Sequence, residues 1–194
     1  MVVRRGPRTR IIVRVSDPEP ATPRTHLGLP VTAFAFPGPL RDELTALVLA
    51  GTKVATAGLF VEWEMEGESV PRPGDREVVI DSDLRPVAII ETTRCEVTTI
   101  AGVSDEFARA EGEGFADAKD WRVAHERFWN GYIEDVRVGL GDPGFALTDG
   151  TEVVCQWFRL VGRLDPETGD ATAVAGAATA APAATAASAP QPER

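Results

Sequence analysis

Residues 87–100 read VAIIETTRCEVTTI, a run of mostly apolar and β-branched side chains with no glycine or proline. Val, Ile and Thr favour strands, because their branched side chains pack well on a pleated surface. A typical strand has about five or six residues, so this run is unusually long. The run therefore predicts a long strand, and a strand of this length can bend through a small barrel.

Three further segments have the composition of strands, with Val, Ile, Thr and aromatic residues prominent. They occupy residues 53–63, 77–81 and 152–164. Pro71, Pro73 and Gly74 lie between the first two and mark a turn region. Strands are thus expected to dominate the fold.

Three helices are expected between these strands. Apolar residues at helical spacing follow Pro39 and stop at Gly51, which is a common end signal. A short helix is expected at residues 104–112 because Ser104 is a good N-cap, and a longer one from about Asp117. The helices do not alternate regularly with the strands, so the predicted fold class is α+β, a small β-barrel with flanking helices.

The chain has 194 residues, enough for one domain with a single core. Residues 1–25 contain five arginines before the first acidic residue and then three prolines, which predicts a flexible basic and proline-rich arm. Residues 165–194 begin with turn-forming residues and continue as Ala, Thr, Pro and Ser, which predicts a disordered tail. The folded domain is expected at residues 26–164.

The overall charge bears on the class of ligand. The net charge is −10, and such a surface repels a polyanion unless basic residues gather on one face. A small ligand is not excluded, since a pocket needs only one or two local cations. The sequence also shows no apolar run suited to a membrane span and no secretory signal, so the cytoplasm is the expected compartment.

Lys53 and Thr56 form the first candidate site, in the segment GTKVAT at residues 51–56. A lysine directly after a helix end is unusual. If apolar neighbours desolvate it, the neutral amine is favoured and Lys53 becomes a candidate base, with Thr56 as nucleophile or hydrogen-bonding partner. The alternative is a solvated lysine that the helix dipole stabilises, followed by an ordinary strand threonine.

Glu111 and Glu113 form the second candidate site, in the segment AEGEG at residues 110–114. The neighbouring glycines allow the backbone to approach a ligand closely and to direct a carboxylate where a regular helix would not. One of the two glutamates could hold a ligand amine or share a proton with Lys53. The alternative is an acidic turn exposed to solvent.

Glu91 is a carboxylate in the middle of the longest apolar run. It is either directed outward by strand alternation or buried with a partner. Lys53 is the expected partner in the second case.

Trp121, His125 and Trp129 recur at intervals of four on the longer predicted helix. Such a row is more often part of a core than of a binding site. The only other histidine is His26, and the two cysteines are far apart and separate from both histidines. The sequence therefore predicts no metal site and no cofactor.

Several motifs together carry a family resemblance. In chain order they are Gly51-x-Lys53-x-x-Thr56, Pro73-Gly74-Asp75, residues 87–93, Phe107-Ala108-x-x-Glu111-Gly112-Glu113, Trp121-x-x-x-His125-x-x-Phe128 and Val153-Val154-Cys155-Gln156-x-Phe158. In order and spacing they resemble the ASCH family, relatives of the PUA domains, over about residues 40–163. The resemblance implies a small PUA-like β-barrel with a cleft beside a helix, and a link to RNA metabolism.

The resemblance also implies roles for individual residues. Some ASCH proteins resemble amidohydrolases that deacetylate acetylcytidine, and by that pattern Lys53 is the base, Thr56 the nucleophile, and Glu113 orients or shares the proton. The residues expected to contact the substrate are Glu91, Glu111, Trp121, His125 and Arg94.

The expected partner is a small nucleoside-like ligand or single-stranded RNA. The alternatives to the amidohydrolase are a single-strand ribonuclease and a non-catalytic module that binds RNA or a nucleotide. A ribonuclease must hold several phosphates, so a set of arginines would have to line one groove. These are Arg76, Arg85, Arg94, Arg122 and Arg127.

Overall fold

The computed structural model describes residues 10–11, 25–165, 167–168 and 170–174. The strands are β1 (Arg10–Ile11), β2 (Thr25–His26), β3 (Leu29–Ala33), β4 (Ala55–Leu59), β5 (Arg76–Ile80), β6 (Pro86–Thr99), β7 (Glu152–Leu164) and β8 (Ala171–Ala173). The helices are α1 (Pro39–Ala50), α2 (Phe60–Glu66), α3 (Asp105–Ala110), α4 (Ala118–Asn130) and α5 (Ile133–Leu140), with a 3-10 turn at Ile100–Gly102.

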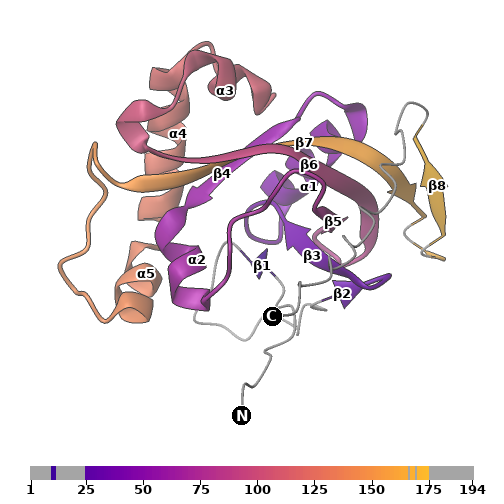
Figure 1. Ribbon diagram of the computed structural model, residues 1–194, viewed down its shortest axis with the longest axis horizontal. Helices are drawn as coiled ribbons and strands as arrows, with labels where there is room; N and C mark the ends of the chain where they lie inside the picture. Colours follow the sequence, from indigo (N-terminus) through magenta and orange to yellow (C-terminus); the bar gives the residue numbers. More distant parts are fainter. Residues whose placement is uncertain (1–9, 12–24, 166, 169, 175–194) are drawn as a thin grey trace, which may run out of the picture.

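The long strands β6 and β7 form the centre of a mixed sheet (Figure 1). Its strand order is β1-β3-β5-β6-β7-β4, while β8 extends the sheet beside β7 and β2 pairs with β3. The β1–β3 and β3–β5 pairs are parallel and the remaining pairs are antiparallel. The strand predicted at residues 87–100 is confirmed as β6.

The sheet is strongly curved but open. Its register shifts between Ile89 and Ile90 and between Thr92 and Arg94, and such irregularities increase the bend of a strand. Thr32 of β3 and Thr56 of β4 line one small cavity, so the two sides of the sheet curl toward a common interior. Among the described residues no pairing joins β4 to β1 or β3. The α+β class is confirmed, whereas the expected barrel is not closed.

Two apolar clusters hold the helices against the sheet. One includes Phe107 of α3, Trp121 and Trp129 of α4 and Val136 of α5, packed on β4 and the first half of β7. The other joins α1 to β3, β5, β6 and the second half of β7. In Figure 1, α3, α4 and α5 accordingly gather at one end of the molecule. None of the described helices has the length and apolar character needed to cross a membrane.

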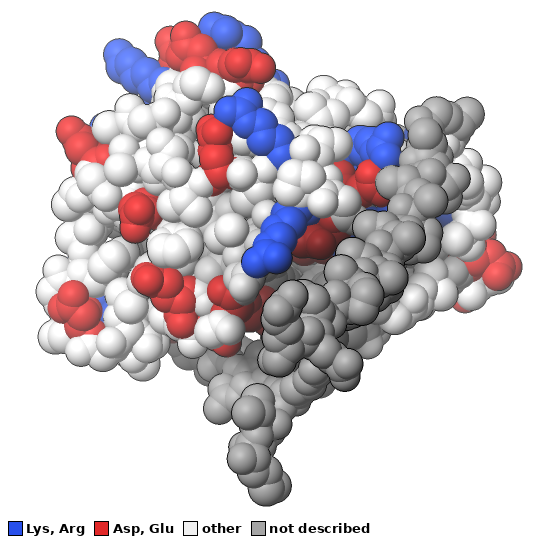
Figure 2. Space-filling view, viewed as in Figure 1, with Lys and Arg blue, Asp and Glu red and all other residues white. Residues whose placement is uncertain are grey.

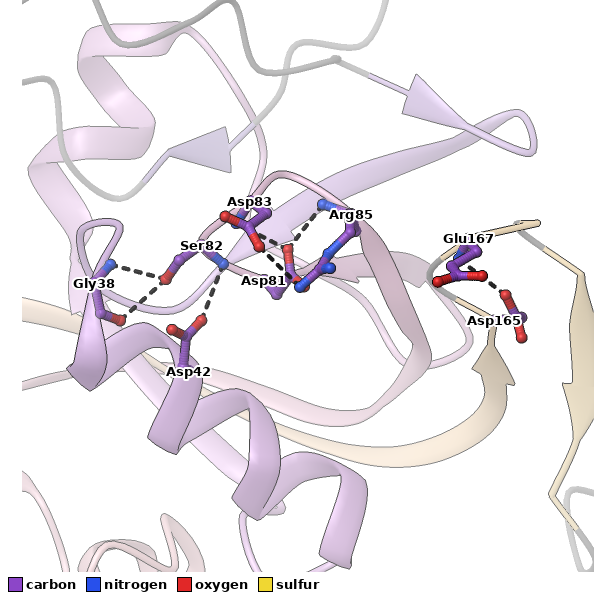
Figure 3. A network of polar contacts seen from close by, with 8 residues as sticks. All are labelled: Gly38, Asp42, Asp81, Ser82, Asp83, Arg85, Asp165 and Glu167. Carbon is purple, nitrogen blue, oxygen red and sulfur yellow. Dashed lines mark hydrogen bonds and ion pairs between the residues drawn. The ribbon is translucent and has the colours of Figure 1, made fainter.

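The turn between β5 and β6 fixes the start of α1 (Figure 3). The Ser82 hydroxyl accepts a hydrogen bond from the Gly38 N–H at 2.8 Å and donates one to the Gly38 carbonyl at 3.0 Å. The Ser82 N–H donates to Asp42 Oδ1 at 3.1 Å. Within the turn, Asp81 accepts hydrogen bonds from the Arg85 backbone at 2.9 Å and from its guanidinium at 2.8 Å.

The predicted helix ends agree closely with the observed ones. Gly51 adopts a φ of 75° directly after α1, and the Ser104 hydroxyl accepts a hydrogen bond from the Phe107 N–H at the start of α3. Asp117 caps α4 in the same way. These ends were predictable because capping depends on residues within one turn of each other.

Other predicted elements need correction. The strand expected at residues 53–63 ends at Leu59, and the chain continues as α2, where Trp63 is buried against the sheet. Helix α5 was not expected. Part of the segment predicted as a flexible arm, Arg10–Ile11 and Thr25, lies in strands β1 and β2. Part of the predicted disordered tail, Ala171–Ala173, forms strand β8. Much of both segments lies outside the described residues. The proposed division at residues 26 and 164 stays a prediction.

Candidate functional site

Lys53 enters the interior directly after α1. Gly51 reverses the chain, and its N–H donates to the carbonyls of Leu47 and Val48. The Lys53 N–H also bonds the Leu47 carbonyl, at 3.1 Å. This tight exit directs the side chain inward, and Lys53 is only 2% exposed. The alternative of a solvated lysine is therefore wrong.

The Lys53 ammonium group meets two carboxylates. Its Nζ lies 2.5 Å from Glu113 Oε1 and 3.4 Å from Glu111 Oε2. It also lies 5.6 Å from the centre of the Phe34 ring. A buried charge must be paired, and these contacts supply the pairing. We refer to Lys53, Glu111 and Glu113 as the Lys53 cluster.

Glu111 is the fully enclosed member of the Lys53 cluster. Its Oε1 accepts a hydrogen bond from Trp121 Nε1 at 3.0 Å, and its Oε2 lies 3.4 Å from His125 Nε2. The other ring nitrogen of His125 lies 3.0 Å from the Trp121 carbonyl. Both ring nitrogens of His125 thus face protein oxygens.

The two carboxyl groups differ in their protonation. Burial by itself would raise the pKa of Glu111, but the positive charges of Lys53 and His125 outweigh it and hold this pKa well below its usual value. Burial raises the pKa of Glu113, partly opposed by Lys53 and reinforced by the negative charge of Glu111. Glu111 is therefore the permanent anion, while Glu113 is the group suited to gain and lose a proton.

Gly112 allows both carboxylates to reach Lys53. It has a φ of 70°, and a Cβ atom at this position would lie 2.3 Å from the Thr52 carbonyl oxygen and 2.8 Å from the Lys53 nitrogen. The backbone contact is continued by a hydrogen bond of 3.0 Å from the Val54 N–H to the Ala110 carbonyl. Only glycine permits this approach without displacing one of the two segments.

The Lys53 cluster lies at a cavity of about 280 Å³ between α1 and α4. Its polar lining consists of Glu43, Lys53, Thr56, Glu111, Glu113 and His125. The apolar lining consists of Phe34, Ala35, Leu40, Leu44, Leu47, Ala57, Phe115, Ala124, Phe128 and Trp129. An apolar cavity with a few converging polar groups is the usual form of a small-molecule site.

The cavity contains most of the residues that the sequence predicted for the site. Lys53, Thr56, Glu111, Glu113 and His125 all line it. They come from the α1–β4 connection, β4, the α3–α4 connection and α4, so the chain brings together groups up to about seventy residues apart. Their chemical roles remain predictions.

Two expected substrate contacts lie elsewhere. Trp121 is fully buried, and its ring stacks on His125 with ring centres 4.2 Å apart, so its face is not offered to a ligand. Arg94 lies outside the cavity, where it pairs with Glu96 and stands 4.3 Å from the centre of the Trp157 ring. Trp129 and Phe128 provide the aromatic lining instead.

The expected pairing of Glu91 with Lys53 is wrong. Glu91 lies on β6 opposite Arg76 of β5 and Arg159 of β7, and it does not line the cavity. Its carboxylate accepts hydrogen bonds from Arg76 Nε at 2.8 Å and from Arg159 Nη2 at 2.6 Å. Strand alternation and cross-strand register together decide this partner, and register could not be predicted locally.

The wall that α1 and the preceding loop provide could not be read from the sequence. The apolar spacing of Leu40, Leu44 and Leu47 was a signal for a buried face, but not for a face that borders a cavity. The sequence also gave no indication that Arg41 is buried. Arg41 is 1% exposed, and its Nε and Nη2 donate to the carbonyl of Ala35, which has a left-handed φ of 58°.

Within the part of the chain that the structure describes, no group of three or more His, Cys, Asp or Glu side chains is arranged to hold a metal ion. Cys95 and Cys155 are free thiols, and burial strongly raises the pKa of Cys155.

The fold and site define a class of protein: a single curved-sheet domain with an ion-paired lysine beside a cavity between two helices. A family model for the ASCH domain matches residues 32–162. The chain belongs to the ASCH domain family, and the resemblance inferred from its motifs is confirmed.

Two crystal structures are similar to the chain. One is protein EF3133 from Enterococcus faecalis, which carries the family label DUF984, with 28% identity and a TM-score of 0.61 over 72% of this chain and 80% of that one. The other is an ASCH domain from Lactobacillus crispatus, with 27% identity and a TM-score of 0.57 over 66% of this chain and 76% of that one. No curated protein matches the sequence.

Replacing Glu91 with Gln should destabilise the protein. The hydrogen bonds from Arg159, and to a smaller extent Arg76, hold the pKa of Glu91 below its usual value despite burial. We expect a loss of about 1–3 kcal/mol in the free energy of unfolding near pH 7, measured in urea. The folded-state pKa is lowered, so this contribution is present above the unfolded pKa and is lost as the pH falls through the folded one.

The matched control is Glu96→Gln, which removes an exposed carboxylate paired with Arg94 on the same strand. This change should cost less than about 0.5 kcal/mol. Equal losses for both variants, or a loss at Glu91 that does not shrink as the pH falls, would contradict the proposed stabilisation.

Replacing Gly112 with Ala should move Glu111 and Glu113 away from Lys53. Gly114→Ala is the control, because Gly114 also has a positive φ, of 91°, but has no atom within 4 Å of the added Cβ. The control should lose about 1–2 kcal/mol of unfolding free energy, because alanine disfavours the left-handed backbone conformation. Gly112→Ala adds a clash between two backbones, and we expect a clearly larger loss, about 3–5 kcal/mol, by urea unfolding. Equal losses of unfolding free energy for the two variants would show that the close approach of Gly112 to Thr52 does not affect stability.

Proposed function

We propose that this protein hydrolyses the amide of a small acylated nucleoside-like compound such as acetylcytidine. One observation carries the proposal: a buried lysine in contact with two carboxylates borders a cavity that a threonine also lines. Nucleophile, base and proton-sharing acid are the three groups that such acyl transfer requires. The family membership supports the choice of this chemistry.

The roles follow from the protonation of the Lys53 cluster. Because the pKa of Glu113 is raised and its carboxylate touches Lys53, this group is suited to take the proton of the Lys53 ammonium and so free the amine to act as the base. Thr56 Oγ attacks the acyl carbon, and its proton passes to Lys53. The carbon–nitrogen bond then breaks as the departing amine takes a proton from Lys53, which leaves an acyl-threonine. Water attacks this ester with Lys53 again as the base, releases the carboxylic acid and restores Thr56.

Glu111 is assigned a positioning role. It stays ionised, is 1% exposed, and holds Lys53, Trp121 and His125 in place. In this scheme it keeps the Lys53 amine directed at the cavity, whereas Glu113, whose side chain is 19% exposed, exchanges the proton.

The lining of the cavity suits a planar ring of nucleoside size. Its volume of about 280 Å³ is near the lower end of the range for small-molecule sites, roughly 300–1,000 Å³. Phe128 and Trp129 from one side and Leu44 and Leu47 from the other provide apolar surfaces on which a flat ring can stack.

The arginines give little support to a polymeric substrate. Arg76, Arg85, Arg94 and Arg122 each pair with a carboxylate. None of these four, and not Arg127 either, lines the cavity. Figure 2 shows the basic side chains of one face as separate groups beside acidic ones, not as a continuous basic surface. A single-strand ribonuclease needs such a surface to hold several phosphates. Binding of a ligand without turnover remains the second candidate, because the cavity suffices for it.

The pH dependence of acetylcytidine hydrolysis tests the assignment of Glu113. Below its pKa Glu113 is protonated and cannot take the proton of Lys53, so turnover is low. As the pH rises through this pKa one proton is lost and activity appears. We expect the acid limb of kcat/KM to have its midpoint above 4.5, the ordinary value of the carboxyl group. Glu113→Gln and Lys53→Met should each lower kcat/KM by about 10²–10⁴-fold.

Lys119 provides the control, since it is the only other lysine of the chain and is exposed on α4. Lys119→Met should retain wild-type turnover. Near-ultraviolet circular dichroism should show that Lys53→Met remains folded. A folded Lys53→Met variant with undiminished turnover would exclude the proposed base.

Activity measured at several salt concentrations distinguishes a nucleoside substrate from an RNA substrate. We expect hydrolysis of acetylcytidine to change less than about twofold between roughly 50 and 200 mM salt, because an uncharged ligand releases no counterions. Cleavage of a single-stranded oligoribonucleotide that falls by about tenfold or more over this interval, in the absence of nucleoside turnover, would favour the ribonuclease instead.

A further inference from the structure

We infer that Glu43 makes the cavity selective for an uncharged ligand over its phosphate ester. This inference rests on the proposed function and specifies its substrate class. It is based on the charged groups of the lining, which offer no free cation to a phosphate and place a carboxylate at the opening.

The cations of the lining are already satisfied. Lys53 is the only Lys or Arg among the described residues that line the cavity, and Glu111 and Glu113 neutralise it. Both ring nitrogens of His125 face protein oxygens, those of Glu111 and the Trp121 carbonyl. A phosphate entering the cavity would lose its hydration without gaining a cationic partner, and such desolvation is unfavourable.

Glu43 adds a negative charge where the cavity meets solvent. It lies on α1 between Leu40 and Leu47, three residues after the first and four before the second, so the three side chains share one face of the helix. All three line the cavity, and Glu43 is exposed. An exposed residue that lines a cavity lies at its opening. Among the described residues no cation pairs with this carboxylate.

The Glu43 carboxylate therefore disfavours a negatively charged ligand at the opening. A phosphate on the sugar of a bound nucleoside carries up to two negative charges, and each is repelled by the exposed carboxylate. A ribose hydroxyl in the same place can instead donate a hydrogen bond to it. The chemical class that fits is an unphosphorylated nucleoside or base.

The test compares the affinities of cytidine and cytidine 5′-monophosphate, measured by isothermal titration calorimetry on the full chain. We expect the wild-type protein to bind cytidine more tightly. Because an exposed charge pair contributes little, Glu43→Gln should reduce the preference by about 3-fold and Glu43→Lys by about 10-fold. The preference should also shrink at high salt, which screens charges at the opening.

Glu64→Lys is the matched control, because Glu64 is an exposed glutamate of α2 that does not line the cavity. It should leave the preference within about twofold of wild type. Equal affinity of the wild type for both compounds, or equal effects of the Glu43 and Glu64 variants, would overturn this inference alone. Failure of both compounds to bind the wild type would overturn the proposed function together with it.

Discussion

The burial of one ammonium group constrains much of this structure. An unpaired charge in the interior costs far more than a domain can tolerate, so Lys53 requires anionic partners at contact distance. Glu111 and Glu113 meet this requirement, and each comes from a segment almost sixty residues later in the chain. The end of α1, the turn before α4 and the first turns of α4 must therefore lie together, and the cavity forms where they meet.

The same constraint explains why the neighbouring residues are specialised. Gly112 gives the turn a backbone that can touch Thr52, and Trp121 and His125 complete the hydrogen bonding of Glu111. A buried polar network is stable only when each member is satisfied. Here the satisfied network leaves Glu113 as the one carboxyl group whose pKa is raised, so the support of the fold and the candidate chemistry arise from one arrangement.

Much of the local structure was predictable from the sequence. The end of α1 at Gly51 and the caps Ser104 and Asp117 depend on residues within a single turn, and the strand composition of β6 depends on side chains in one run. Helix α2 was missed because Trp63 and its neighbours have strand composition, and packing of Trp63 against the sheet decides in favour of the helix. Glu91 was misplaced because its partners depend on cross-strand register.

The sequence by itself determined most of the elements and the family that the motifs match, and it named five polar residues that line the cavity among eight expected for the site. Only the tertiary structure decided that the pKa of Glu111 is lowered while that of Glu113 is raised. It also decided that Trp121 stacks on His125 and not on a ligand, and that α1 closes one side of the cavity. The physical reason is range: caps and propensities act over a few residues, whereas burial and charge pairing are set by segments that only the folded sheet and helices bring together.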